Sequence, residues 1–270
     1  MKAIQCPLCG SGSDKHTLLY KYDLYGFKKC STCSLVMQNP QPVFSDITER
    51  YDEDYFKYEI ENEEPFFALM MMALSDIDFD SLDFSSSSEK SILDIGCATG
   101  RFLFEFKNRG WKTAGVEICE SAAQYGNKHR GVNIQNCPLE DAQFPDKSFS
   151  VVHASHLIEH LNDPGSFLKE IYRILDEKGY LIIVTPNIDS LQGVLFRSKW
   201  RSAIADHLFL YSLKTLENMC CKYGFTRIRK KTWGGLARGL APAGIKKIFD
   251  KAAKKTGTGD VMVMLLQKKG

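Results

Sequence analysis

Short apolar runs alternate with helix-like segments from residue 89 to the end of the chain. Five short runs of β-forming residues and two strand-like runs near the C-terminus predict seven strands, at residues 91–95, 113–117, 133–136, 150–153, 180–185, 225–233 and 261–267. Between them, apolar residues recur at helical spacing over residues 101–108, 121–127, 167–175 and 213–223. Strands that alternate with helices are typical of a parallel sheet covered by helices. We therefore predict an α/β fold with a mostly parallel sheet of seven strands.

The residues before this sheet fall into two zones. Residues 1–43 are polar, rich in turn-forming residues and contain two pairs of cysteines. Residues 44–88 are acidic, with an apolar helical stretch at 66–74 and a terminal serine run that indicates a linker. We predict a small N-terminal domain at 1–43, a helical linker or lid at 44–88 and a main domain at 89–270. An irregular segment near 186–210 would form an insertion in the main domain.

The amino-acid composition indicates the general class of protein but says little about its activity. The 270 residues are 44% hydrophobic and 25% charged, as in ordinary globular proteins. The longest apolar run is far shorter than the roughly 20 residues of a membrane helix, and the N-terminus lacks the apolar stretch of a signal peptide. We expect a cytoplasmic protein without a membrane span. In that compartment, four paired cysteines among nine favour a metal site over a disulfide framework.

The net charge of +2 conceals two segments of opposite charge. Residues 46–89 are rich in acids, and residues 222–255 are rich in lysine and arginine. We interpret the basic segment as a solvated surface, with an anionic substrate or a nucleic acid as the alternative.

A glycine-rich turn follows the first predicted strand. Asp94-Ile95-Gly96-Cys97-Ala98-Thr99-Gly100 leads from that strand into the helix that begins at Arg101. Glycines at such a junction let the backbone approach a ligand closely. Glu117 ends the next strand, where an acidic side chain can bind the hydroxyls of a ribose. The strand, turn, helix, strand and acid together predict a nucleotide-binding site.

Residues 93–100 resemble the first motif of class I S-adenosylmethionine-dependent methyltransferases, and Val116-Glu117 resembles the second. A third similarity, at 139–146, completes the order of motifs within a likeness that covers about 89–233. The resemblance implies an enzyme with a Rossmann-like methyltransferase sheet and S-adenosylmethionine as cofactor. The resemblance further implies that the turn faces the methionine part of the cofactor, that Glu117 binds the ribose and that the third motif contacts the adenine. It assigns these residues to the cofactor: Asp94, Gly96, Cys97, Ala98, Gly100, Glu117, Ile118, Leu139 and Glu140.

Two positions depart from the family pattern. Ala98 replaces a glycine in the middle of the turn, and Ser150 stands where an aspartate usually begins the fourth strand. Neither change removes a cofactor contact. A nicotinamide-binding fold is the competing interpretation, but that fold prefers a GxGxxG turn, whereas the glycines here are spaced GxxxG.

The four paired cysteines are Cys6, Cys9, Cys30 and Cys33. Two CxxC pairs can supply the four thiolates of a closed, structural zinc site. Unligated thiols and redox chemistry are the alternatives. Together with Asn39-Pro40-Gln41-Pro42, the pairs resemble bacterial methyltransferases with an N-terminal zinc ribbon, whose members often act on sugars, glycans or other small metabolites. The resemblance therefore implies structural zinc and a small N-terminal zinc ribbon.

A base that deprotonates a hydroxyl acceptor can be sought among His156, Glu159, His160 and His207. The first three follow the fourth strand, at the sheet edge where ligands bind. We expect His156 and His207 to be the catalytic residues. Residues 156–160 also resemble the ExxEH cluster of ubiquinone-pathway O-methyltransferases, which binds a divalent ion, but His156 replaces the first acid. The HxxEH spacing of inverzincin proteases is disfavoured by the strand-to-helix context.

The first functional hypothesis is methyl transfer to a small-molecule or glycan acceptor, with O-methylation expected. An RNA methyltransferase that uses the zinc ribbon for recognition is the alternative, although the modest lysine excess of residues 1–43 makes nucleic acid an unexpected partner. A zinc-ribbon binding protein with a decayed enzyme domain is disfavoured because the turn and Glu117 are retained.

Overall fold

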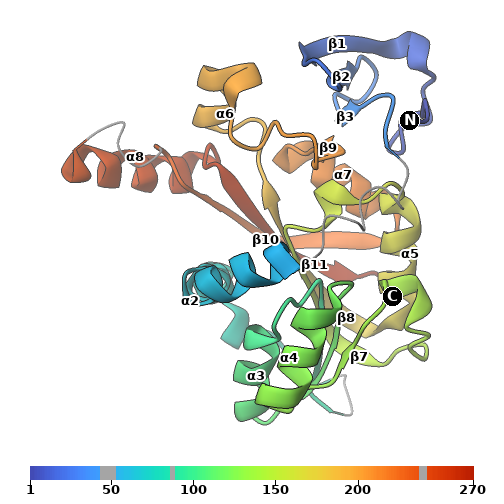
Figure 1. Ribbon diagram of the computed structural model, residues 1–270, viewed down its shortest axis with the longest axis vertical. Helices are drawn as coiled ribbons and strands as arrows, with labels where there is room; N and C mark the ends of the chain where they lie inside the picture. The colour runs from blue at the N-terminus through green and yellow to red at the C-terminus, as the bar shows by residue number, and fades with distance from the viewer. Residues whose placement is uncertain (43–52, 86–88, 237–241) are drawn as a thin grey trace.

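The computed structural model describes residues 1–42, 53–85, 89–236 and 242–270. Its largest element is a seven-stranded sheet in the order β10-β11-β8-β7-β4-β5-β6 (Figure 1). Its strands are β4 (Ser91–Ile95), β5 (Lys112–Val116), β6 (Ile134–Gln135), β7 (Phe149–Ser155), β8 (Leu175–Pro186), β10 (Phe225–Trp233) and β11 (Val261–Lys268). Neighbours from β6 to β8 are parallel, and β11 runs antiparallel to β8 and β10. The predicted seven-stranded, mostly parallel sheet is confirmed.

The central strands are buried on both faces, which explains why their sequences are continuous apolar runs. Every residue of β4 is buried, as are the first six of β7. β4 lies between β5 and β7, so the connections on its two sides leave in opposite directions. Ligands of open α/β sheets bind beyond the carboxyl ends of the strands at such a point. The strand order therefore places the glycine turn at the binding edge.

Helices cover both faces of this sheet. They are α3 (Arg101–Asn108), α4 (Glu120–Arg130), α5 (Pro164–Ile174) and α7 (Leu213–Lys222). Phe102 of α3 belongs to one buried cluster, whereas Phe167 of α5 and Leu216 of α7 belong to another. α5 begins where it does because the Asp163 carboxylate caps its first turn. The capping and the two clusters fix the helices close to the predicted positions.

Helix α2 (Glu53–Asp76) is much longer than the apolar stretch at 66–74 that indicated it. Only Ala73 and Leu74 of this helix are buried. The polar first half is held by side-chain contacts to α3 and α4, described below, so it carries little apolar periodicity. Figure 1 shows α2 lying beside α3 and α4, near the binding edge. The predicted linker boundary at 44 and the junction at 88 lie outside the described residues.

A second sheet joins the N-terminal zone to the irregular segment near 186–210. β1 (His16–Lys21), β2 (Gly26–Cys30) and β3 (Val36–Gln38) are extended by β9 (Phe209–Leu210), in the order β1-β2-β3-β9. The amide of Gln38 also donates to the carbonyls of Ala205 and His207, at 2.6 and 2.8 Å. The N-terminal zone is therefore completed by a strand from the distant insertion.

Two helices were not indicated by the sequence pattern. α6 (Leu191–Phe196) follows β8, and α8 (Ala243–Thr256) lies between β10 and β11. α6 is too short for a periodicity to emerge, and in α8 the apolar residues are interspersed with lysines. Single 3₁₀ turns occur at η1 (Ser13–Lys15), η2 (Phe79–Ser81), η3 (Leu139–Asp141), η4 (Ile158–His160) and η5 (Arg197–Lys199). Among the described residues, no helix combines the length and apolarity needed to cross a membrane.

Candidate functional site

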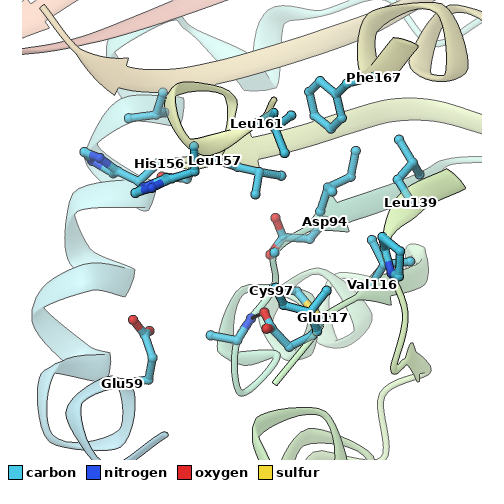
Figure 2. Close-up of a pocket in the computed structure, with 18 of the residues that line it drawn as sticks. Glu59, Asp94, Cys97, Val116, Glu117, Leu139, His156, Leu157, Leu161 and Phe167 are labelled. Carbon is cyan, nitrogen blue, oxygen red and sulfur yellow. Dashed lines mark hydrogen bonds between the residues drawn. The ribbon is translucent and has the colours of Figure 1, made fainter. Parts of the chain in front are cut away.

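A cleft of about 910 Å³ opens at the carboxyl ends of β4, β5 and β7. The glycine turn forms its floor and α2 its opposite wall, as Figure 2 shows. Eight residues that the sequence assigned to the cofactor line this cleft: Asp94, Gly96, Cys97, Ala98, Glu117, Ile118, Leu139 and Glu140. The ninth, Gly100, lies just behind them at the start of α3. The local motifs are thus brought together at one place.

The turn has left-handed backbone at three positions, Gly96, Ala98 and Gly100. A Cβ at Gly100 would lie 2.9 Å from side-chain atoms of Val132 and Ile134, so glycine is required there. Ala98 adopts φ of 46°, which is unfavourable for a residue with a side chain. The residue that departs from the family pattern is therefore a strained position in the turn.

Glu117 ties the turn to the next strand and helix. Its two carboxylate oxygens accept hydrogen bonds from the backbone amides of Ala98 and Cys119, each at 2.8 Å. The carboxylate is buried, and burial raises the pKa of Glu117 even though these amides act in the opposite direction. Each carboxylate oxygen has a second lone pair, so the group can still accept hydrogen bonds from a ligand.

An apolar wall adjoins Glu117 on the side of η3. Leu139, Leu161 and Phe167 line the cleft there and surround a space beside Val116 (Figure 2). Leu139 and Phe167 are buried in the main core, so their positions are fixed by packing. Such a wall suits a flat, apolar ring system.

Helix α2 is fastened over the turn by acidic side chains. Glu63 accepts from the hydroxyl of Thr99 and pairs with Arg130 Nη2 at 2.6 Å. Glu64 accepts from Arg101 Nε at 3.0 Å. These partners lie in the turn, at the start of α3 and at the end of α4. The acidic segment recognised in the sequence therefore serves in part to attach α2 to the binding edge.

Glu59 projects from α2 on the side of the cleft opposite Glu117 (Figure 2). Burial, followed by the negative charge of Glu117, raises the pKa of Glu59 to about 7. The cleft therefore has a carboxyl group on each of two facing walls. Glu59 and the pairs of α2 were not singled out by sequence, because a role for them requires α2 to fold back over the turn.

His156 stands at the other end of the cleft, just after β7. Its φ of 51° is left-handed, and its imidazole is half-exposed toward the cleft. Nδ1 lies 3.3 Å from Oε1 of the buried Glu159. The two atoms lie within ion-pair distance but do not form an aligned hydrogen bond, since Oε1 has no hydrogen-bond partner among the described atoms. A strained histidine that faces a cleft is a common feature of functional sites.

The Glu159 carboxylate is held by its surroundings. Its other oxygen accepts from the Thr185 hydroxyl at 2.9 Å. Burial would raise the pKa of Glu159, but the contact with His156 and the nearby rings of His160 and His207 lower it to about 2. Glu159 therefore remains a carboxylate at neutral pH, beside three imidazoles.

His160 and His207 pack edge to face, with ring centroids 4.7 Å apart. Each Nδ1 donates to a backbone carbonyl, that of Asp206 at 2.9 Å for His160 and that of Ser202 at 2.8 Å for His207. Burial lowers the pKa of His207 to about 4. His160 lines the cleft, whereas His207 does not and lies behind it. Of the two histidines expected to be catalytic, His156 therefore faces the cleft and His207 lies behind its wall.

The potential metal ligands near this end differ from those suggested by the ExxEH comparison. Ligand atoms of Glu159, His160 and His207 lie within 4.8 Å of one another, and His156 is not part of that group. The cluster contains two imidazoles and a carboxylate, which are ligands of Zn²⁺ and similar ions. Each Nδ1 of the two imidazoles is engaged by a backbone carbonyl, whereas Oε1 of Glu159 has no hydrogen-bond partner among the described atoms, and we assign the cluster no ion.

The four paired cysteines converge at one point of the N-terminal zone. Sγ atoms lie 3.4 Å apart for Cys6 and Cys33 and 3.6 Å apart for Cys9 and Cys30, and all four lie within 4.8 Å of one another. Sulfurs at about 2.3 Å from a tetrahedral Zn²⁺ are about 3.8 Å apart. The donor set and spacing fit that ion.

His153 is a buried residue of the site that sequence reasoning missed. Nδ1 of His153 donates to Asp94 across the pair β4 and β7. Only the register of two strands far apart in sequence brings these residues together, so no local signal existed. Arg201 and Trp233 also line the cleft from segments whose position depends on the tertiary fold.

Comparisons with known proteins describe the same kind of domain. A family model described as a methyltransferase domain matches residues 77–230, more than half of the chain. The chain is 28% identical over 148 residues to the tRNA U34 carboxymethyltransferase of Helicobacter pylori, covering 51% of this chain and 56% of that protein. It is 27% identical over 101 residues to the ubiquinone biosynthesis O-methyltransferase of Rhodopseudomonas palustris, covering 36% and 40%. The chain thus spans about half the length of these curated relatives.

A solved structure shares the fold. The SAM-dependent methyltransferase of Thermotoga maritima matches with a TM-score of 0.57 and 22% identity, covering 80% of this chain and 98% of that one. At this identity the likeness concerns the fold alone.

Proposed function

Because the chain belongs to the family of methyltransferase domains, we propose that it is an S-adenosylmethionine-dependent methyltransferase that acts on a hydroxyl of a small molecule or glycan. When bound, the cofactor supplies a methyl group on a positively charged sulfur. The protein must position two reactants and remove a proton from the acceptor. The observation that carries the proposal is the joined unit of glycine turn and Glu117 on the floor of the cleft.

The residues present fit the cofactor. Glu117 would hold the ribose hydroxyls, and the turn from Asp94 to Gly100 would face the methionine part. Leu139 and Phe167 would cover the adenine ring on the apolar wall. Glu59 would place a second carboxyl group opposite Glu117, and a positive charge on the cofactor would favour its ionised form. Helix α2 would exclude water from the floor of the cleft.

His156 is the proposed base for the acceptor hydroxyl. Its imidazole faces the cleft, and the Glu159 carboxylate behind it favours a proton arriving on the ring. A cleft of about 910 Å³ is at the upper end of the usual size for ligand sites, which leaves room for an acceptor beside a nucleotide.

His207 is proposed to act through neighbouring side chains, without contacting the acceptor. Because His207 lies behind His160 and near Glu159, it would orient those side chains and not touch the acceptor itself. We therefore retain it as a positioning residue of the site.

A structural zinc ion is proposed on Cys6, Cys9, Cys30 and Cys33. Four thiolates close the coordination shell, so the site would stabilise the N-terminal sheet and take no part in methyl transfer. The ribbon would support the segment near 186–210, which carries Arg201 and Asp206 into the cleft wall.

RNA is the second candidate acceptor, supported by the similarity to tRNA U34 carboxymethyltransferases. That acceptor requires a basic surface that continues to the cleft. RNA binding by the full chain with a steep dependence on salt would favour it. Absence of binding at physiological salt would count against it.

Titration calorimetry with S-adenosylmethionine tests the central proposal. The wild-type chain should bind, and Glu117→Ala should weaken binding about 10- to 100-fold, because hydrogen bonds to a charged group are lost. Asp80→Asn, at an exposed position, is the matched control. Failure of the wild type to bind would overturn the proposed activity, and wild-type affinity in Glu117→Ala would overturn the ribose assignment. Mass-shift screening of sugars and metabolites would then identify the acceptor.

A further inference from the structure

Helix α8 exposes a row of apolar side chains. Ile245, Ile248 and Phe249 are 47%, 69% and 41% exposed. With the exposed Ala252 they recur at spacings of three and four, so they lie along one face of the helix. Such a row is costly in water. Within the described parts of the chain, no segment covers it.

A neighbouring face of α8 is attached to the main domain. Ala253 is buried, and its carbonyl accepts from the Thr232 hydroxyl of β10 at 2.9 Å. The Asp250 carboxylate accepts from the amide of Gly235 at 2.8 Å. These contacts hold the helix in one orientation, so the apolar row is presented outward. Figure 1 shows α8 projecting away from the main sheet.

A row of lysines borders the apolar row. Lys247, Lys251 and Lys255 are four residues apart and exposed. None of the three forms an ion pair with a described carboxylate, whereas Lys246 and Lys254 are paired with Asp250 and Asp76. Three uncompensated positive charges therefore lie along the edge of the exposed apolar face.

Helix α6 presents a similar surface nearby. Its first residue, Leu191, donates its amide to the carbonyl of Thr258 in the turn after α8, at 2.9 Å. Val194 and Leu195 of α6 are 62% and 60% exposed. Exposed basic residues of η5 follow directly: Arg197 and Lys199. The combination of apolar and basic side chains is thus repeated on two helices that meet at one turn.

We propose that α8, together with the exposed end of α6, attaches the protein to an anionic lipid surface. Helices with an apolar face, a lysine-rich border and modest overall hydrophobicity lie in the plane of a membrane interface. There the isoleucine and phenylalanine side chains enter the acyl boundary while the lysines meet anionic headgroups. The attachment is peripheral and does not depend on which acceptor is methylated.

Two other occupants fit the surface less well. A nucleic acid would neutralise the lysines but leave Ile248 and Phe249 exposed. A second copy packed through α8 about a two-fold axis would place the same lysine row on both sides of the contact, and lysine is depleted in protein interfaces. An anionic lipid surface complements the apolar row and the charges together.

Flotation of the full-length chain with lipid vesicles tests the inference. The protein should float with vesicles of phosphatidylcholine and phosphatidylglycerol, and much less with phosphatidylcholine alone. A triple variant, Lys247→Gln with Lys251→Gln and Lys255→Gln, should bind about 100-fold more weakly, at about fivefold per lysine. Ile248→Ser with Phe249→Ser should also abolish flotation. Both effects together support lipid attachment.

Matched controls distinguish binding through this surface from nonspecific adsorption to vesicles. Leu24→Ser removes a side chain that is 86% exposed on the N-terminal zone, and Lys128→Gln removes an exposed lysine on α4. Both controls should float like the wild type, and all variants should keep the wild-type melting temperature. Flotation that is absent in the wild type, or unchanged in the α8 variants, would overturn the inference.

Two measurements identify the competing occupants. If a fluorescent RNA oligonucleotide binds and is released by the lysine variant alone, the surface serves nucleic acid and the lipid inference fails. If light scattering finds a dimer that Ile248→Ser with Phe249→Ser converts to a monomer, α8 joins two copies and the inference also fails.

Discussion

Nδ1 of His153 lies 2.7 Å from Oδ1 of Asp94, and both side chains are buried within the main sheet. The parallel register of β4 and β7 places the two residues opposite each other. The imidazole also stacks on Phe102, with ring centroids 4.4 Å apart. The carboxylate at the beginning of the glycine turn is therefore fixed by a residue from a different strand.

Replacement of His153 by alanine should destabilise the fold and disturb the turn. The change leaves the Asp94 carboxylate buried without its partner, so we expect a loss of about 3 kcal/mol in the free energy of unfolding. Denaturant unfolding measures this loss, and calorimetry should find weaker cofactor binding. His129→Ala, which removes an exposed histidine from α4, should change neither. An equal loss in both variants would show that the contact with Asp94 is unimportant.

The attachment of α2 should control how fast the cofactor leaves. Glu63→Gln weakens the contacts with Thr99 and Arg130, because the amide lacks the negative charge. We expect the dissociation rate to increase about tenfold, from the loss of a charge-assisted hydrogen bond. Stopped-flow fluorescence measures that rate, with Glu61→Gln on the exposed side of α2 as control. If the rate is unchanged, α2 does not retain the cofactor.

Protonation of His207 should make the protein less stable in acid. The pKa of His207 is about 4 in the folded chain and about 6.5 when unfolded, so only the unfolded chain gains a proton between these values. This contribution to stability is complete above pH 6.5 and is lost as the pH falls toward 4. The difference amounts to about 3 kcal/mol.

His207→Asn isolates this effect, because its side-chain amide can still donate to the Ser202 carbonyl. Unfolding free energies of the two proteins should be compared from pH 7 to pH 4. The wild type should lose its advantage over the variant as the pH falls. Parallel curves would mean that His207 is not held neutral by burial.

Removal of one cysteine ligand should release the predicted zinc. Cys30→Ser should lose the metal, found as one zinc per chain in the wild type by elemental analysis, and should lower the melting temperature. Cys221→Ser, at an exposed cysteine outside the cluster, should retain both. A wild type purified without metal that neither binds Zn²⁺ nor gains stability from it would contradict the assignment.

The features that could be predicted from the sequence are those set by residues close to one another along the chain. The glycine turn and Glu117 follow directly from two strands and their ends, so their meeting could be expected from chain order alone. The CxxC pairs likewise indicate a metal site through short-range spacing. The parallel strands β4 and β7 are recognisable because buried parallel strands carry continuous apolar runs, whereas the antiparallel β10 is recognisable from the alternation of its exposed basic residues.

Long-range pairings could not be predicted in this way. The contact between Asp94 and His153 depends on strand register, and the role of Glu63 depends on α2 folding over the turn. His207 was expected to face the acceptor, yet the structure places it behind His160 because β9 draws its segment toward the N-terminal sheet. Helix α8 carries a helical spacing of apolar residues that the sequence prediction did not use, and its apolar row is exposed instead of packed in the core.

The sharing of one sheet by β3 and β9 has a consequence for protein engineering. Residues 1–43 have the spacing of a detachable module, but Tyr22 donates to the carbonyl of Ser198 and Gln38 to that of Ala205. A chimera that exchanges only the N-terminal module would therefore combine an edge strand with a mismatched partner. Grafting requires the N-terminal zone and the segment near 186–210 to be transferred as a pair. Recombination between relatives should therefore be tolerated only when both segments come from the same parent.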